Sequence, residues 1–98
     1  MSFAEKLKQE QDTRFEDYAI EFAGEIESAL VESAREGYTG YEIKLSDRDD
    51  KHILSNRVFQ KKLELLLDGC KVKTEQKKFR DLLFKRDYYR NYLVINWN

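Results

Sequence analysis

The last stretch of the chain, RDYYRNYLVINWN at residues 86–98, decides how the fold closes. From Tyr88 to Trp97 its apolar and polar side chains alternate, which is the period of a β-strand with two different faces. Leu93, Ile95 and Trp97 share one face, and we expect that face to lie in the core. The opposite face has two tyrosines around an arginine, and its residues are Tyr88, Arg90, Tyr92, Val94 and Asn96. The sequence therefore predicts a closing core strand whose second face meets solvent or a partner.

Two earlier segments repeat this alternation and supply partner strands. The segment YEIKL at residues 41–45 directs Tyr41, Ile43 and Leu45 to one face. The segment CKVKT at residues 70–74 begins a second strand. Together with the closing strand, these segments predict a small sheet of three mostly antiparallel strands.

A helix is expected between the first two strands. Ser46 or Asp47 can cap its start, and Gly69 stands where a helix commonly ends. Its core face is expected to consist of Leu54, Val58, Phe59, Leu63 and Leu66. The segment after the second strand, residues 77–87, is interpreted as a charged connection. The apolar triplet inside it, residues 82–84 (LLF), is expected to fold back onto the domain.

The N-terminal part of the chain is helical and acidic. Thr13 opens a capping box and Gly37 ends the helix, so an acidic helix is predicted at residues 13–36. Its apolar stripe consists of Phe15, Ala19, Phe22, Ile26, Leu30 and Ala34. An earlier capping box at Ser2 predicts a short helical arm at residues 1–12. The order is thus helix–strand–helix–strand–strand: one α+β domain spanning residues 1–98, with an α+β core at 41–97 and helices covering one face of the sheet.

Charge is distributed very unevenly along the chain, although the net charge is only −1. Residues 1–50 contain 6 basic and 14 acidic side chains, a net charge of −8, whereas residues 51–98 contain 12 basic and 5 acidic ones, a net charge of +7. Such an asymmetry indicates a nucleic-acid face or an acidic interaction surface, unless the two halves neutralise each other within one chain or across a dimer.

Composition limits the setting and the chemistry. Cys70 is the single cysteine, so no internal disulfide can form, which favours a reducing compartment and a cytoplasmic location. No apolar run approaches the roughly 18 residues of a membrane span, so no membrane partner is expected. His52 is the single histidine, and a continuous helix would place it about 25 Å from Cys70, which argues against a Cys–His dyad.

Metal and phosphate motifs are also missing from the sequence. The acidic run at 47–50 lacks the glycine and the glutamate that an EF-hand loop needs, and one histidine with one cysteine cannot form a structural zinc site. The four glycines are scattered and form no phosphate-binding loop. We therefore expect no enzyme activity, no cofactor and no metal.

Two kinds of binding surface remain. The first prediction is a protein-interaction or regulatory accessory protein, acting as a small homodimer or on another protein. Its contacts would be two apolar residues of the arm and the acidic helix face, namely Phe3, Leu7, Glu21, Glu25 and Glu32.

The alternative prediction is a nucleic-acid-binding protein that uses a basic C-terminal hairpin. Basic side chains would neutralise phosphates and tyrosines would stack on bases, through Lys71, Lys73, Lys77, Lys78, Arg80, Arg86, Tyr88, Arg90 and Tyr92. The order of elements is similar to that of winged-helix domains, which also contact nucleic acid with a basic hairpin. The usual winged-helix order has an additional helix before the hairpin, and the sequence shows no such helix.

The portion from Tyr41 to Trp97 resembles small uncharacterised α+β proteins encoded by phages and mobile elements of Gram-positive bacteria. The residues that carry this resemblance are YEIKL before a capped helix, then LLLDG, a lysine-rich strand and the closing LVINW. No catalytic motif accompanies it. The resemblance implies an accessory role in which the protein binds a host or phage component.

Overall fold

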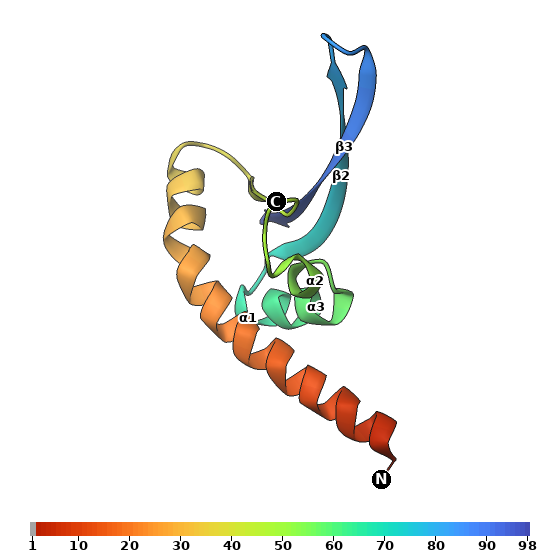
Figure 1. Ribbon diagram of the computed structural model, residues 1–98. Coiled ribbons are helices and arrows are strands. Elements are labelled where there is room, and N and C mark those ends of the chain that lie inside the picture. The colour runs from red at the N-terminus through yellow and green to blue at the C-terminus, as the bar shows by residue number, and fades with distance from the viewer. Residues whose placement is uncertain (1) are drawn as a thin grey trace.

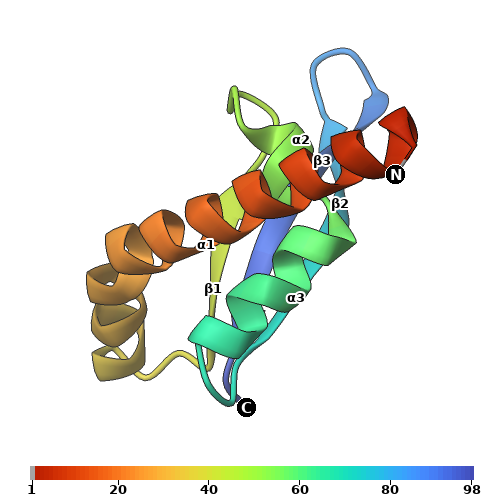
Figure 2. The same cartoon turned by 90° about the horizontal axis from the view of Figure 1, so that it is seen from below.

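The computed structural model describes residues 2–98 and confirms the predicted α+β class. In chain order the elements are α1 (Phe3–Arg35), β1 (Gly40–Lys44), α2 (Lys51–Leu54), α3 (Arg57–Leu66), β2 (Lys71–Asp81) and β3 (Arg86–Asn96). The helices pack on one face of the sheet, and α1 crosses that face in the view from below (Figure 2). Within residues 2–98, no helix lies over the opposite face of the sheet (Figure 2).

Helix α1 is one continuous helix of 33 residues, where the sequence suggested an arm followed by a separate helix. The Ser2 hydroxyl caps it by accepting a hydrogen bond from the backbone N–H of Glu5 at 3.1 Å. The second capping site at Thr13 is not used, because residues 8–12 are mostly good helix formers and the helix continues through them. Apart from Met1, which lies outside the described residues, the predicted arm forms the first turns of α1. These turns extend beyond the rest of the molecule (Figure 1).

The apolar stripe of α1 enters the core over its central turns. Its buried members are Phe15, Ala19, Phe22 and Ile26. Leu30 is half-buried, and Ala34 is exposed in the last turn. Gly37 follows the C-cap with φ of 96°, in the left-handed region where glycine is favoured, so the helix ends where the sequence predicted.

The predicted second helix is wrong as a single element, because it is two helices separated by Ser55 and Asn56. Asn56 has extended backbone angles, and its side chain accepts a hydrogen bond from the N–H of Val58 at 2.9 Å. This N-cap starts α3 in a new direction, so the helical spacing across the break no longer holds. Leu54, Phe59 and Leu63 are buried as predicted, together with two residues that were not predicted, Ile53 and Gln60. The predictions for Val58 and Leu66 are wrong, since both side chains are exposed.

The three strands form one antiparallel sheet in the order β1-β3-β2. The closing strand β3 is therefore central, with Leu93 opposite both Ile43 and Thr74. Leu93 and Ile95 are fully buried against the helices, as predicted, whereas Trp97 follows the strand and is only partly buried.

Strands β2 and β3 continue well beyond β1 as a two-stranded ribbon. The last pair of β1 is Lys44 with Tyr92, and the pairs from Gln76–Asn91 to Asp81–Arg86 have no third strand beside them. At 3.3 Å per residue, these six pairs project about 20 Å from the body. The charged connection predicted at residues 77–87 is therefore wrong, because most of it is strand. Residues 82–84 do not fold back, since they form the exposed tip of the ribbon (Figure 1).

Phe59 is at the centre of the aromatic core and joins the helices to one another. Its ring centroid lies 6.4 Å from that of Phe15, 6.0 Å from that of Tyr18 and 6.2 Å from that of Phe22. Next to it, Gln60 is the only polar side chain that is fully buried among residues 2–98. The ring contacts hold α3 against α1.

Candidate nucleic-acid interface

The uncovered face of the sheet gathers most of the residues predicted to bind nucleic acid. The strand register places seven of the nine on this face: Lys71, Lys73, Lys77, Arg86, Tyr88, Arg90 and Tyr92. Lys78 and Arg80 point to the opposite side of the ribbon, because they stand at the alternate positions of β2. Both of these residues are exposed, because this part of the ribbon extends beyond the helices. The ribbon therefore presents basic side chains on both of its faces.

The tyrosines of this face already have partners within the chain. The ring of Tyr88 stacks on that of Phe79, with centroids 5.5 Å apart and an interplanar angle of 20°. The guanidinium of Arg90 lies 5.2 Å from the centroid of the Tyr88 ring, and the ammonium of Lys77 lies 5.3 Å from that of Tyr92. The ring faces that were predicted to stack on bases are thus largely occupied.

Some of the predicted basic residues are neutralised by neighbouring carboxylates. Lys77 donates to both carboxylate oxygens of Glu42 at 2.6 and 2.7 Å, and this contact raises the pKa of the ammonium. Lys78 pairs with Asp87 at 3.2 Å, and Lys73 approaches Glu75 at 3.8 Å. The basic residues of the ribbon with no ion pair to any other described residue are Lys71, Arg80, Lys85, Arg86 and Arg90.

The tip of the ribbon is a hydrogen-bonded turn, whereas the sequence predicted that its apolar residues fold back onto the domain. The Oδ1 atom of Asp81 accepts hydrogen bonds from the N–H groups of Leu83, at 2.9 Å, and Phe84, at 3.2 Å. Lys85 then closes the turn with φ of 54°. Leu82, Leu83 and Phe84 are 83%, 82% and 66% exposed. The signal that could have revealed them is the aspartate before the apolar triplet, since Asp commonly opens a tight turn.

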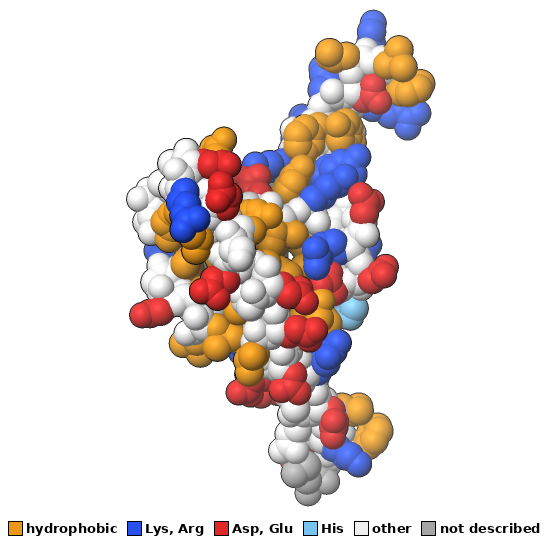
Figure 3. Space-filling model, turned by 90° about the vertical axis from the view of Figure 1, so that its left-hand side faces the viewer, with side chains coloured by type: hydrophobic (Ala, Val, Ile, Leu, Met, Phe, Trp, Pro, Cys, Tyr) orange, Lys and Arg blue, Asp and Glu red, His pale blue; other side chains and the backbone are white. Residues whose placement is uncertain are grey.

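The predicted protein-interaction residues lie on α1, away from the ribbon. Phe3 is 73% exposed and Leu7 is 52% exposed on the turns that project past the body. Glu21, Glu25 and Glu32 are exposed, and their spacing puts them on one side of the helix. Figure 3 shows hydrophobic side chains at both ends of the molecule and acidic ones over the middle, with Lys and Arg beside the hydrophobic atoms at the ribbon end.

The two charged halves of the chain hardly neutralise each other. Among residues 2–98, only two ion pairs join the acidic half to the basic half, Lys62–Asp12 at 3.1 Å and Lys77–Glu42. The acidic face of α1 and the basic ribbon instead remain separate surfaces. The interpretation in which the halves cancel within one chain is therefore not supported.

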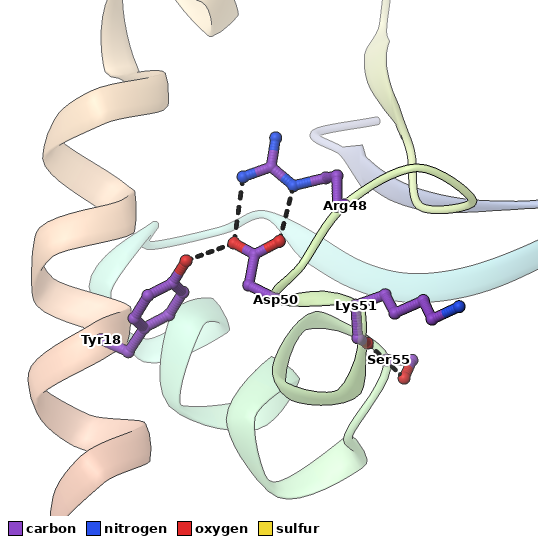
Figure 4. Close-up of polar contacts among 5 residues, drawn as sticks. All are labelled: Tyr18, Arg48, Asp50, Lys51 and Ser55. Carbon is purple, nitrogen blue, oxygen red and sulfur yellow. Dashed lines mark hydrogen bonds and ion pairs between the residues drawn. The ribbon is translucent and has the colours of Figure 1, made fainter.

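A polar cluster holds α1 against the loop that precedes α2 (Figure 4). Arg48 donates to the Asp50 carboxylate through Nε at 2.8 Å and Nη2 at 3.0 Å, and the Tyr18 hydroxyl donates to the same carboxylate. The bond from Arg48 lowers the pKa of Asp50, while burial and the neighbouring carboxylate raise the pKa of Tyr18. No buried side-chain nitrogen or oxygen among the described residues lacks a hydrogen-bond partner, so we interpret this cluster as structural.

The groups considered for catalysis do not form a site. The distance argument against a His52–Cys70 dyad is wrong in its premise, because the helix between the two residues is broken. The two surface hollows that His52 lines include Ser55, Thr74 and Asn91 but not Cys70. Burial also raises the pKa of Cys70 and so disfavours its thiolate. No group of three or more metal-binding side chains occurs within residues 2–98. No helix in the same range is long and apolar enough to cross a membrane.

Comparisons with known proteins add no further assignment. No protein-family model, curated protein or solved structure matches the chain significantly. The resemblance to phage and mobile-element proteins therefore stays a prediction.

Proposed function

We propose that this protein binds double-stranded nucleic acid through the projecting β2–β3 ribbon. The observation that carries the proposal is the set of basic residues on the ribbon that have no carboxylate partner. Phosphate neutralisation and the accompanying release of counterions favour such side chains. A two-stranded ribbon is also slim enough to lie in a groove of a duplex.

The order of the elements supports this proposal over the protein-interaction alternative. Splitting the predicted second helix supplies the additional helix that was missing, so the order becomes helix–strand–helix–helix–strand–strand, as in winged-helix domains. In that arrangement the β2–β3 ribbon is the wing. This likeness concerns order alone and is an analogy, so the function rests on the ribbon itself.

The exposed side of α3 argues for contacts to phosphates rather than to base edges. Val58, Lys61 and Leu65 share this side, and two of them cannot donate or accept a hydrogen bond. Because Tyr88 already stacks on Phe79 and the Lys77 ammonium already lies over the Tyr92 ring, stacking on unpaired bases is also disfavoured. We therefore expect a duplex ligand, bound with little sequence preference.

The acidic side of α1 would orient the ligand. Glu21, Glu25 and Glu32 repel a polyanion from the helix side, whereas the ribbon attracts it. The separation of the two charged surfaces gives the approach a direction, which a uniformly basic protein would lack.

The test is the salt dependence of binding to a mixed-sequence duplex, followed by fluorescence anisotropy. Arg80→Gln combined with Arg86→Gln removes two unpaired cations, and the slope of log K against log salt should fall by about 1.8. The matched control is Lys6→Gln with Lys8→Gln, which removes the same charge from the exposed start of α1. Equal losses in both double variants, or no binding by the wild type, would refute the proposal.

A second candidate function, homodimerisation through the start of α1, is supported by a separate observation. Phe3 and Leu7 lie one helical turn apart at the start of α1, and their side chains are 73% and 52% exposed. A second copy could cover both residues, and an accessory role on another protein would use the same surface. Phe3→Ser with Leu7→Ser should then lower the mass measured by light scattering toward that of a monomer. A wild-type protein that is monomeric across a wide concentration range would exclude the dimer.

A further inference from the structure

We infer that the tip of the ribbon is an apolar wedge that enters the minor groove of a duplex and kinks it. This inference rests on the proposed function and names the form of nucleic acid that the ribbon recognises. It concerns the turn at residues 82–85, which neither the core nor the polar clusters of the protein use.

The tip is shaped for insertion. Two hydrogen bonds to Asp81 hold the backbone of the turn, while the side chains of Leu82, Leu83 and Phe84 point into solvent. Large apolar side chains gathered at one exposed point favour a site where they can leave water. Because the turn is fixed, little conformational entropy would be lost when they do so.

The surroundings of the tip select an anionic partner. Arg80, Lys85 and Arg86 flank the apolar residues and have no ion pair with any described residue, and the Oδ1 atom of Asp81 is engaged in the turn. A duplex offers phosphates along the edges of the minor groove and an apolar base stack beneath. Apolar wedges of this kind, inserted between base steps, are a known means of kinking DNA.

The length over which the charge extends favours a duplex over an anionic membrane. Basic residues occur on both faces of the ribbon from its tip back to the start of β2, and they include Lys78, Arg90 and Lys71. A groove presents phosphates along this whole length, whereas a membrane surface would meet only the residues at the level of the tip. The membrane is therefore an outcome of the test and not a second proposal.

The experiment measures binding and bending together, using a duplex that carries a donor and an acceptor dye at its two ends. We expect the wild type to shorten the distance between the ends. We also expect it to bind a duplex with a central two-base bulge about tenfold more tightly than an intact one, because the bulge removes the cost of unstacking. Leu82→Ser, Leu83→Ser and Phe84→Ser together should abolish bending and this preference, yet bind the intact duplex within about threefold of the wild type, since the charge is unchanged.

The matched control is Ile20→Ser with Val31→Ser, which makes the same chemical change at exposed apolar positions of α1, away from the ribbon, and should leave bending intact. Binding without bending by the wild type would overturn the wedge but leave the proposed function standing. Absence of binding would overturn both. Bending that survives in the tip variant would also overturn the wedge, as would a tip variant that loses only binding to vesicles of anionic phospholipid, because the tip would then be a membrane contact.

Discussion

The Lys77 ammonium crosses the central strand and donates to both carboxylate oxygens of Glu42, at 2.6 and 2.7 Å. On the way it lies over the ring of Tyr92, so the aliphatic part of its side chain covers the middle of the uncovered sheet face. This contact joins β1 to β2, which are not neighbours in the sheet. Lys77, which was predicted to bind nucleic acid, is therefore already paired with a carboxylate of the same chain.

Glu42→Gln should strengthen binding to duplex nucleic acid because it frees Lys77 for a phosphate. One additional phosphate contact should raise the salt slope by about 0.9, and at about 0.1 M salt this corresponds to a gain of roughly fivefold to tenfold in affinity. The measurement is anisotropy with a mixed-sequence duplex at several salt concentrations.

A double variant distinguishes release of the lysine from simple loss of a negative charge. Glu42→Gln with Lys77→Gln should lose the gain, because the contact would depend on the ammonium. If the gain persists in the double variant, Lys77 makes no phosphate contact and the interpretation of this pair is wrong.

Asp50 should make the stability of the protein depend on pH in the acid range. The pKa of Asp50 is lowered in the folded state, so its contribution is fully present above its unfolded pKa of about 4 and is lost as the pH falls through the folded value. The pKa of Tyr18 is raised, so its contribution is present below about pH 10 and is lost as the pH rises through its folded value. Urea unfolding followed by circular dichroism at a series of pH values would measure the loss of stability at low pH (the acid limb) and the loss at high pH.

Asp50→Asn should cost about 2 kcal/mol in the free energy of unfolding at pH 7, since a carboxylate that is only 14% exposed loses charged hydrogen bonds. It should also flatten the acid limb. Asp49→Asn is the control, because the neighbouring Asp49 is exposed and makes no side-chain hydrogen bond to another described residue. Parallel acid limbs for the wild type and Asp50→Asn would contradict the assignment.

Gln60 should be one of the most sensitive polar positions in the core. Its Nε2 atom donates to the Leu54 carbonyl oxygen at 2.9 Å and to the Thr74 hydroxyl at 2.7 Å, which links α2, α3 and β2. Gln60→Met keeps the length of the side chain but leaves the end of α2 unsatisfied, at a cost of about 1–3 kcal/mol in unfolding free energy. Thr74→Val, at an exposed position, should cost less than about 1 kcal/mol. Equal costs for the two variants would show that the buried carbonyl does not matter.

The same glycine-to-alanine substitution should have opposite effects at two positions. Gly37 has φ of 96°, so Gly37→Ala should destabilise the protein by about 1 kcal/mol. Gly24 lies inside α1 with nothing within 4 Å of an added Cβ, so Gly24→Ala should stabilise it by about 0.5–1 kcal/mol. Thermal unfolding of the two variants checks both signs, and a shift in the same direction would contradict the assigned end of α1.

Turn residues explain where prediction from the sequence succeeded and where it did not. Gly37 ended the first helix as expected, because only a residue that tolerates positive φ fits there. Asn56 began a new helix in the middle of what the apolar spacing presented as one. A side chain that can cap a helix N-terminus is also common in loops. The spacing of the apolar residues alone could therefore not decide between one helix and two.

The candidate site was predicted by residue type but not by placement. Alternation assigned Tyr88, Arg90 and Tyr92 to one face of the closing strand, and the register confirms that they share it. Which of the basic residues carry a counterion could not be read from the sequence. Lys77 and Glu42 are 35 positions apart and meet only because β3 lies between their strands.

The sequence by itself determined the α+β class, the acidic helix at residues 13–36, the presence of three strands and the inward residues Leu93 and Ile95, because each follows from local periodicity and from capping residues. Only the tertiary structure decided that residues 82–84 face solvent at the end of a ribbon. An apolar triplet is buried or exposed according to where its strands point, and that direction is set by long-range pairing in β2 and β3. The part of the molecule that carries the proposed function is therefore the part that local sequence patterns determine least.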